Sequence, residues 1–156
     1  MEREGVSLRK AELSDADRIL EMQKIAFREI YEKYRDEKTS PVCEPLEKVR
    51  MRIIQEGRIY YLIEVGNKTV GAINIAASAG GMKKIAPIFL LPEFQGYGYA
   101  EETIRKIEEI YGSERWELET ILEEEKLCRF YERLGYRKTS KITPINDRMN
   151  LVEYRK

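Results

Sequence analysis

The chain has 156 residues, enough for a single domain with one hydrophobic core. Lysine plus arginine and aspartate plus glutamate both number 28, so there is no net positive charge to attract nucleic acid or an anionic membrane surface. The chain contains no histidine, which excludes a Ser-His-Asp or Cys-His hydrolase and leaves proton transfer to carboxylates, Tyr, Cys, Lys, water or the backbone.

The first third of the chain predicts a strand followed by two helices. Residues 6–11 alternate in the manner of a strand, and Ser14 with Asp17 forms an N-cap pair for a helix that extends to about Tyr34. Pro45 suits the first turn of a second helix, which ends at Gly57. The expected buried positions are Ile19, Met22, Ile25, Ala26 and Ile30 on the first helix, and Leu46, Val49 and Ile53 on the second.

The rest of the chain predicts strands interrupted by two helices. Residues 58–65 and 69–77 read as an antiparallel hairpin, and a third strand follows, which includes the apolar run 85–91. The remaining elements are a helix at 100–111, a strand at 116–121, a helix at 125–134, and strands at 136–141 and 149–154. This order, β-α-α-β-β-β-α-β-α-β-β, predicts an α/β fold with a mixed, mostly antiparallel central sheet and helices on both faces. No linker is visible, so residues 1–156 are expected to form one domain.

A glycine-rich turn joins the third strand to the following helix. The segment is Pro92-Glu93-Phe94-Gln95-Gly96-Tyr97-Gly98-Tyr99-Ala100. Gly96 and Gly98 let a ligand approach the backbone closely, and the first N–H groups of a helix have no intrahelical partner. Together with the helix dipole, these groups predict a phosphate-binding site, although glycines that only turn a corner remain the alternative.

Two sequence blocks carry a resemblance to a known family. Gln95-x-x-Gly98-x-Ala100 resembles the Gln/Arg-x-x-Gly-x-Gly/Ala signature of the GCN5-related N-acetyltransferase (GNAT) family, and Phe130-Tyr131-Glu132-Arg133-Leu134-Gly135-Tyr136 is similar to the family's "FYEKLGF" segment. The resemblance implies that the loop amides hold the pyrophosphate of acetyl-CoA, the acetyl donor. The implied donor-binding loop residues are Gln95, Gly96, Tyr97, Gly98, Tyr99 and Ala100.

The resemblance also implies a gap in the sheet. Two neighbouring central strands would splay apart after Leu90, and the pantetheine arm of the donor would lie between them. The backbone of Ile88, Phe89 and Leu90 would then bind the arm like an added strand, while their side chains build the core.

Tyr131 is the expected general acid, because the family uses the Tyr of its "FY" pair to protonate or hydrogen-bond the departing thiolate. A half-buried aromatic on an amphipathic helix is the alternative.

Glu119 is the candidate base, acting on the ammonium directly or through water, with a solvated strand position as the alternative. Glu124 stands where the family often has an Asn that contacts the coenzyme; it could keep that contact, act as a base, or only complement a helix dipole.

Tyr31 and Tyr34 are candidates for the acceptor site, because the resemblance places the first helix and its following connection in the acceptor wall.

From the resemblance and these candidate residues we expect an N-acetyltransferase that moves an acetyl group from acetyl-CoA to a primary amine, of a small molecule or of a protein, by direct transfer in a ternary complex. The alternative is a non-catalytic acyl-CoA-binding or sensing domain. No metal, nucleic acid or membrane partner is expected, a homodimer is plausible, and the charged residues 1–4 favour a cytoplasmic location.

Overall fold

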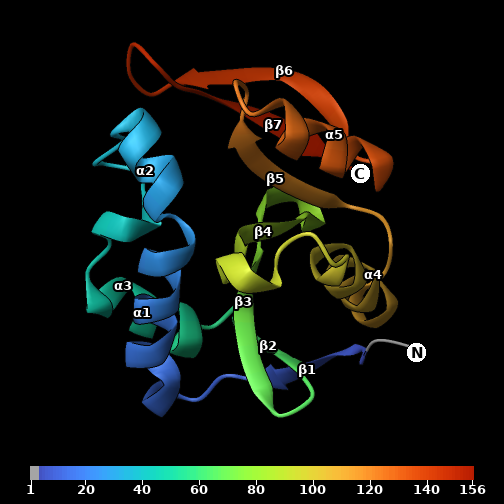
Figure 1. The fold of residues 1–156 in the computed structure, drawn as a ribbon. Helices are drawn as coiled ribbons and strands as arrows, with labels where there is room; N and C mark the ends of the chain where they lie inside the picture. The colour runs from blue at the N-terminus through green and yellow to red at the C-terminus, as the bar shows by residue number, and fades with distance from the viewer. Residues whose placement is uncertain (1–3) are drawn as a thin grey trace.

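A computed structural model describes residues 4–156 of the chain (Figure 1). Residues 1–3, part of the charged start used above for the expected location, lie outside the described residues. The strands are β1 (Val6–Lys10), β2 (Arg58–Val65), β3 (Lys68–Ala77), β4 (Lys83–Leu90), β5 (Trp116–Ile121), β6 (Arg137–Pro144) and β7 (Asn150–Arg155). The helices are α1 (Ala16–Ala26), α2 (Arg28–Tyr34), α3 (Leu46–Ile54), α4 (Tyr99–Tyr111) and α5 (Glu125–Arg133).

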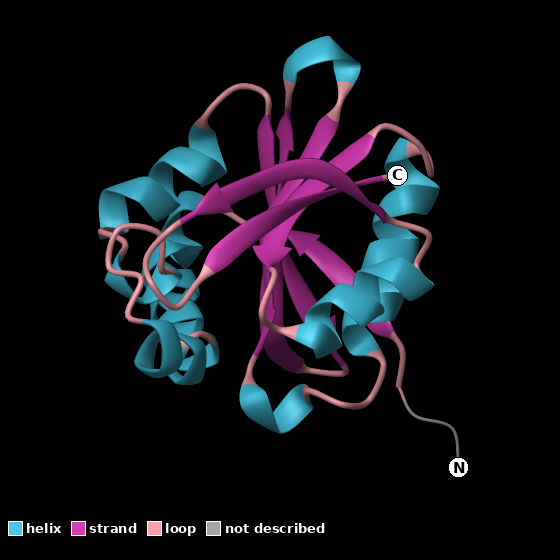
Figure 2. Cartoon of the chain, turned by 90° about the horizontal axis from the view of Figure 1, so that it is seen from above, coloured by secondary structure: helices cyan, strands magenta, loops and turns pink. Residues whose placement is uncertain are grey.

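All seven strands form one sheet, in the order β1-β2-β3-β4-β5-β7-β6. Neighbouring strands are antiparallel except β4 and β5, which are parallel, so the predicted mixed and mostly antiparallel sheet is confirmed. Seen from above, the strands fan out between two groups of helices (Figure 2). One hydrophobic core lies between the sheet and α4 and α5, and a second lies between the sheet and α1 and α3. The predicted helices on both faces are thus also confirmed.

The parallel pairing of β4 with β5 is very short. Only Lys83 with Trp116 and Lys84 with Glu117 are partners, so the two strands separate after Lys84. The expectation that they separate after Leu90 is therefore wrong, because the gap opens within β4. Pro87 follows the last pair by three residues and has no backbone N–H to contribute to a ladder.

The first predicted helix is divided in two. A short 3-10 turn, η1 (Leu13–Asp15), precedes α1, and the chain bends at Phe27 between α1 and α2. Ser14 is not the N-cap; instead the Asp15 carboxylate accepts a hydrogen bond from the Glu12 backbone N–H at 2.8 Å. The observed pair, Glu12 with Asp15, lies two residues before the predicted one, because a 3-10 turn precedes the α-helix.

The buried stripe of α1 also differs from the prediction. Ile19 and Met22 are buried as expected, but Ile25 is 50% exposed. The fully buried position beside Met22 belongs to Gln23, whose amide donates to the Pro41 carbonyl at 2.9 Å and thereby joins α1 to η2 (Pro41–Cys43). A polar residue can take this place because its buried amide nitrogen is hydrogen-bonded.

Gly71 fixes how closely β3 approaches β4. It lies opposite Leu90, and a Cβ at this position would meet the Phe89 carbonyl oxygen at 2.0 Å. Only glycine allows this approach, so Gly71 helps to position the end of β4 that leads into the glycine-rich turn. Within residues 4–156, no helix has both the length and the apolar character needed to cross a membrane.

Candidate active site

The glycine-rich turn begins where β4 ends. After Leu90 the chain forms a 3-10 turn, η4 (Pro92–Phe94), and α4 starts at Tyr99. Gly96 has a φ of 87° and Gly98, the N-cap of α4, has a φ of 84°. Side chains disfavour this left-handed region. A Cβ on Gly96 would meet no atom within 4 Å, so backbone conformation, rather than crowding within the chain, favours glycine there.

The backbone N–H groups of this turn are available to a ligand. Within residues 4–156, no hydrogen bond is made by the N–H of Gly96, Gly98 or Ala100. The turn from 91 to 100 contains no Lys or Arg. An anion bound here would therefore be held by amides and by the positive end of the α4 dipole.

Gln95 has a structural contact that the sequence does not reveal. Its side-chain Nε2 donates to the Leu90 carbonyl oxygen at 2.9 Å, which holds the turn against the end of β4. Tyr97 is 60% exposed, whereas Tyr99, the first residue of α4, is only 9% exposed and packs in the core. Of the two tyrosines, Tyr97 is thus the one accessible to a donor.

Two glutamates occupy the first turn of α4, where they would oppose a bound phosphate. Glu102 is directed toward β1, and its carboxylate accepts a hydrogen bond from the Val6 backbone N–H at 2.6 Å. Glu101 pairs with Arg105 one turn later at 3.2 Å. Both carboxylates thus have partners away from the glycine-rich turn.

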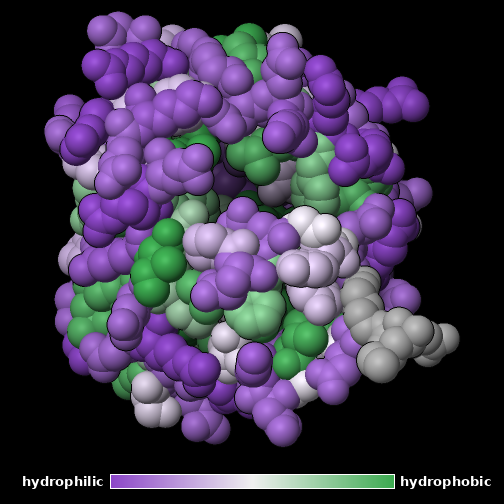
Figure 3. Space-filling model, in the orientation of Figure 1, coloured by the Kyte–Doolittle hydropathy of each residue, from purple (hydrophilic) through white to green (hydrophobic). Residues whose placement is uncertain are grey.

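The gap between β4 and β5 exposes one edge of β4. Ile88, Phe89 and Leu90 pair with β3 on their other edge, and no described strand pairs with them on the β5 side. The surface drawn in Figure 3 is hollowed near its centre, and apolar side chains border the hollow. An extended ligand arm fits such an edge, because unpaired backbone groups can bind it as a strand would.

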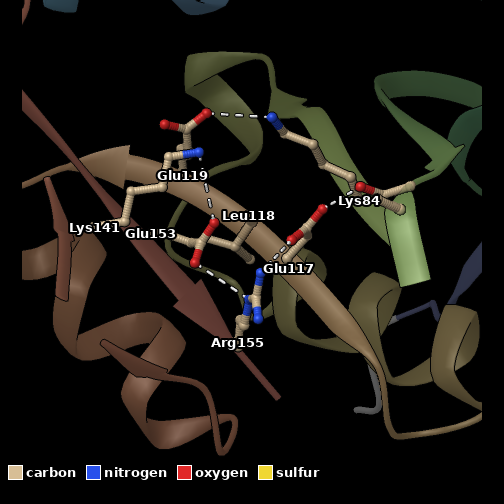
Figure 4. Close-up of a pocket in the computed structure, with 9 residues that line it drawn as sticks. Lys84, Glu117, Leu118, Glu119, Lys141, Glu153 and Arg155 are labelled. Atoms are coloured by element: carbon tan, nitrogen blue, oxygen red, sulfur yellow. Dashed lines mark hydrogen bonds and ion pairs between the residues drawn. The ribbon is translucent and has the colours of Figure 1, made fainter. Parts of the chain in front are cut away.

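Glu119, the predicted base, lies just beyond the point where the two strands separate. It follows Glu117, the last β5 residue that pairs with β4, by two positions and therefore shares its face of the sheet. Its carboxylate Oε1 is 3.2 Å from Nζ of Lys84 (Figure 4). The two side chains line a cavity of about 260 Å³.

The same cavity contains two further glutamates that the sequence analysis did not single out. The Glu117 carboxylate accepts a hydrogen bond from the Ser78 hydroxyl and lies 3.4 Å from the Arg155 guanidinium, and the Glu153 carboxylate lies 3.2 Å from the same guanidinium (Figure 4). The spacing of Glu117 and Glu119, two residues apart on one strand, could have predicted that both lie on the same face. The approach of Glu153 depends on the pairing of β5 with β7, which no local pattern reveals.

Tyr131 lies on the buried face of α5. Ring centroids of Phe130, Tyr136 and Tyr154 lie 5.0, 5.9 and 6.3 Å from its own. Within the described residues its hydroxyl has no hydrogen-bond partner, and burial raises the pKa of the phenol to about 12. Tyr131 is therefore protonated at neutral pH and can donate a hydrogen bond.

Tyr34 and Glu124 come together although they are far apart in the sequence. Tyr34 is only 4% exposed, and its hydroxyl donates to the Glu124 carboxylate. Lys33 also pairs with Glu124, at 2.7 Å. Burial alone would raise the pKa of Glu124, but hydrogen bonds from Lys33 and Tyr34 hold it below its ordinary value. Tyr31 is half-buried, with the Arg35 guanidinium 5.3 Å from its ring centre.

Residues 21–136 match the model of the Acetyltransferase (GNAT) family. A comparison with curated protein sequences finds no significant match. Among solved structures, the chain is similar to an acetyltransferase from Thermus thermophilus, with a TM-score of 0.75 and 14% identity over 99% of this chain and 97% of that one.

Two other similar structures have named substrates. A spermidine N-acetyltransferase from Vibrio cholerae, in complex with CoA and spermine, has a TM-score of 0.75 and 19% identity over 96% of this chain and 93% of that one. An acetyltransferase from Salmonella typhimurium that modifies the N-terminal serine of ribosomal protein L7/L12 has a TM-score of 0.75 and 17% identity over 97% and 94%. At these identities the structures show a shared fold, and the family match covers more than half of the chain. The protein therefore belongs to the acetyltransferase (GNAT) family, whose enzymes use acetyl-CoA as the acetyl donor.

Proposed function

We propose that this protein transfers an acetyl group from acetyl-CoA to a primary amine directly, within a ternary complex. The observation that carries the proposal is the position of Glu119, at the start of the gap whose far end opens onto the glycine-rich turn. A donor bound along β4 would then have phosphate-binding amides at one end and a carboxylate at the other. Neither Cys43 nor Cys128 has a histidine to activate it, because the chain contains none, and Cys128 is buried, which favours direct transfer.

The donor supplies the acetyl thioester, and the chain supplies positioning and proton transfer. The amine nitrogen forms a bond to the carbonyl carbon, and the carbon–sulfur bond breaks. Before the attack Glu119 takes one proton from the ammonium, directly or through water, which gives the nucleophilic amine. The nitrogen loses its second proton as the amide forms, and this proton passes through solvent to the departing sulfur. The products are an N-acetyl amide and the free thiol of CoA.

Tyr131 has the role of stabilising the leaving thiolate. Its pKa of about 12 exceeds the usual thiol value of about 8.5, so full proton transfer from the phenol to sulfur would be unfavourable. A hydrogen bond to the developing charge avoids this cost and still lowers the barrier. The packed rings around Tyr131 support the role because they hold the phenol in one orientation.

The residues of the glycine-rich turn would hold the donor's pyrophosphate, and Gln95 would act indirectly by fixing the turn to Leu90. Glu124 is engaged with α2, so in this proposal it supports the site rather than contacting the donor. Tyr34 has the same supporting role, whereas Tyr31 remains a candidate for contact with the acceptor.

Free-thiol release from acetyl-CoA, measured with a panel of primary amines, tests the proposed reaction. We expect release that depends on both the enzyme and the amine, together with donor binding by calorimetry. Donor binding without release for any amine would instead support a non-catalytic acyl-CoA-binding domain. A covalent acetyl-enzyme detected by mass spectrometry in the absence of amine would contradict direct transfer.

The proposal also covers the whole chain and its setting. One continuous seven-stranded sheet, and structural matches over almost the entire chain, support a single catalytic domain in residues 1–156. We propose that the enzyme is cytoplasmic and, because its charge is balanced, that it has no nucleic-acid partner. A homodimer is included in the proposal on the resemblance alone, and sedimentation analysis would test it.

A further inference from the structure

A row of charged side chains crosses the sheet at the point where β4 and β5 separate. Strand pairing places Arg58 opposite Ala76, Ala76 opposite Lys84, and Lys84 opposite Glu117. Residues directly opposite one another in a sheet share a face. Arg58, Lys84 and Glu117 therefore lie on the same face as Glu119, and the row connects β2 with the proposed catalytic carboxylate.

A second cavity, of about 270 Å³, lies on this face beside the first. Four cationic side chains line it, and no acidic one does: Lys48, Arg52, Arg58 and Lys84. Lys84 lines both cavities, so the second cavity is a neighbour of the one that holds Glu119.

The positive charge of the second cavity is only partly balanced within the protein. Glu44 accepts two hydrogen bonds from Arg52, at 2.6 and 2.7 Å, and also lies 3.3 Å from Lys48. Arg58 has no carboxylate partner in the described residues, and one of its nitrogens donates to the Asn74 side-chain oxygen at 3.1 Å. Burial and the nearby Arg52 lower the pKa of Arg58, which reflects the unfavourable charge of this site.

The geometry points to an acceptor that carries an oxyanion as well as the amine, and this inference rests on the proposed acetyl transfer. The ammonium group lies at Glu119, and a carboxylate or phosphate lies in the second cavity near Arg58. Guanidinium groups suit both oxyanions because they donate several hydrogen bonds in one plane.

A purely cationic acceptor fits this face less well. Glu119 is paired with Lys84, and Glu117 and Glu153 are both near Arg155, so each carboxylate already has a protein cation. A polyamine would bring further positive charge toward Arg58 and Lys48. An acceptor with both charges can replace the ion pair between Lys84 and Glu119. Its ammonium pairs with Glu119, and its oxyanion then balances the positive charge of Lys84.

The strand spacing gives the approximate length of this acceptor. Arg58 and Glu117 are three strand spacings apart, about 14 Å between their backbones, and Glu119 lies two residues further along β5. Side chains reach inward from both ends and shorten the span. The amine and the oxyanion should therefore be separated by several bonds, as in an ω-amino carboxylate or a short acidic peptide, rather than as in glycine.

Matched acceptors test the inference. Thiol release from acetyl-CoA is measured with glycine, γ-aminobutyrate and longer ω-amino carboxylates, each beside its uncharged amide, and with phosphoethanolamine beside ethanolamine. We expect kcat/KM to favour the anionic member of the longer pairs by roughly tenfold or more, the effect of one good charged hydrogen bond. The carboxylate and phosphate pairs identify which oxyanion the cavity prefers.

Three variants locate the effect. Arg58→Gln should raise KM for anionic acceptors and leave the amides unchanged, and Arg58→Lys should restore part of the preference. Arg50→Gln is the control, because Arg50 lies on α3 but does not line the cavity. Unchanged acetyl-CoA binding by calorimetry shows that each variant is folded.

Several outcomes would overturn the inference. Equal rates for acids and amides, or the best rates with spermidine, would overturn it while the proposed acetyl transfer stands. A uniform loss of activity in Arg58→Gln, for charged and uncharged acceptors alike, would mean that Arg58 has only a structural role. Absence of thiol release with every amine would overturn both the acceptor class and the proposed function. If acetyl-CoA still binds in that case, the protein is a non-catalytic acyl-CoA-binding domain.

Discussion

At the scale of single residues, Tyr131 offers a test that separates chemistry from packing. Tyr131→Phe keeps the ring contacts and removes only the hydroxyl, so acetyl-CoA affinity should change little. Turnover should fall by roughly 10²-fold, as expected when one donor to a developing negative charge is lost. Steady-state kinetics with calorimetry of donor binding would measure both.

Tyr136→Phe is the matched control for this change. The Tyr136 hydroxyl is also buried and unpaired in the described part of the chain, and its ring lies 5.9 Å from that of Tyr131. This variant should retain wild-type turnover. If Tyr131→Phe does so as well, Tyr131 contributes packing alone.

Glu119 can be tested through the pH dependence of the reaction. Glu119→Gln should lower kcat/KM most at low pH, where amines are protonated and a base is needed. Raising the pH toward the amine pKa, about 10, supplies free amine and should partly rescue the variant. A pH-rate series with wild type and variant would measure this convergence.

Glu117→Gln is the control in the same cavity, since Glu117 precedes Glu119 by two residues on the same strand. Its profile should run parallel to that of wild type. A parallel profile for Glu119→Gln would instead mean that water, rather than Glu119, accepts the proton of the ammonium.

At the scale of elements, the junction of β4 with α4 predicts a selective loss of donor binding. Gly98→Val adds a branched side chain at a φ of 84° and blocks close approach of a phosphate. Acetyl-CoA affinity by calorimetry should fall severely. Gly112→Val is the control at the other end of α4, where a φ of 95° and a ψ of 161° also disfavour a side chain, so it shows what backbone strain alone does to donor affinity. Equal affinity in the two variants would exclude the turn from the donor site.

The elements themselves were largely predictable because their signals are local. Alternating apolar residues, the Gly66-Asn67 turn and the glycine at 112 marked strands, the hairpin and a helix end. The break at Phe27 was not predictable, since the apolar pattern continues from α1 into α2. The position of the gap between β4 and β5 depends on strand register, which a single sequence does not contain.

The site was predictable only in part, for a related reason. Sequence motifs identified the glycine-rich turn, Tyr131 and Glu119 as candidates. They could not identify the partners of these groups, such as the ion pair of Lys84 with Glu119 or the hydrogen bond from Gln95 to the Leu90 carbonyl. These contacts arise from the fold or from side-chain direction. Tyr34 is the clearest case, since its partner Glu124 lies 90 residues away.

At the scale of the whole molecule, Glu124 connects α2 to the start of α5 through Tyr34 and Lys33. Glu124→Gln should lower stability by roughly 1 kcal/mol, the usual contribution of a hydrogen bond. For a chain of this size the Tm should fall by about 2–4 °C in thermal unfolding. Glu125→Gln, at an exposed neighbouring position, should have no measurable effect.

The same contact predicts a pH dependence of the free energy of unfolding. The pKa of Glu124 is lower in the folded state, so its stabilising effect is complete above the ordinary value of about 4.5 and is lost as the pH falls through the folded value. The Tm difference between wild type and Glu124→Gln should therefore shrink in acid. A difference that stays constant down to pH 3, on the order of the range where carboxylates titrate, would contradict this account.

The two halves of the sheet, β1 to β4 and β5 to β7, are joined through only two residue pairs. The open edge of β4 is therefore a sheet edge enclosed within the molecule rather than at its rim. Exposed edges invite pairing with other extended chains, and proteins usually protect them. In the proposed complex, the donor covers this edge and bridges the halves, so the substrate would also complete the sheet, and the empty enzyme would be the form more prone to aggregation.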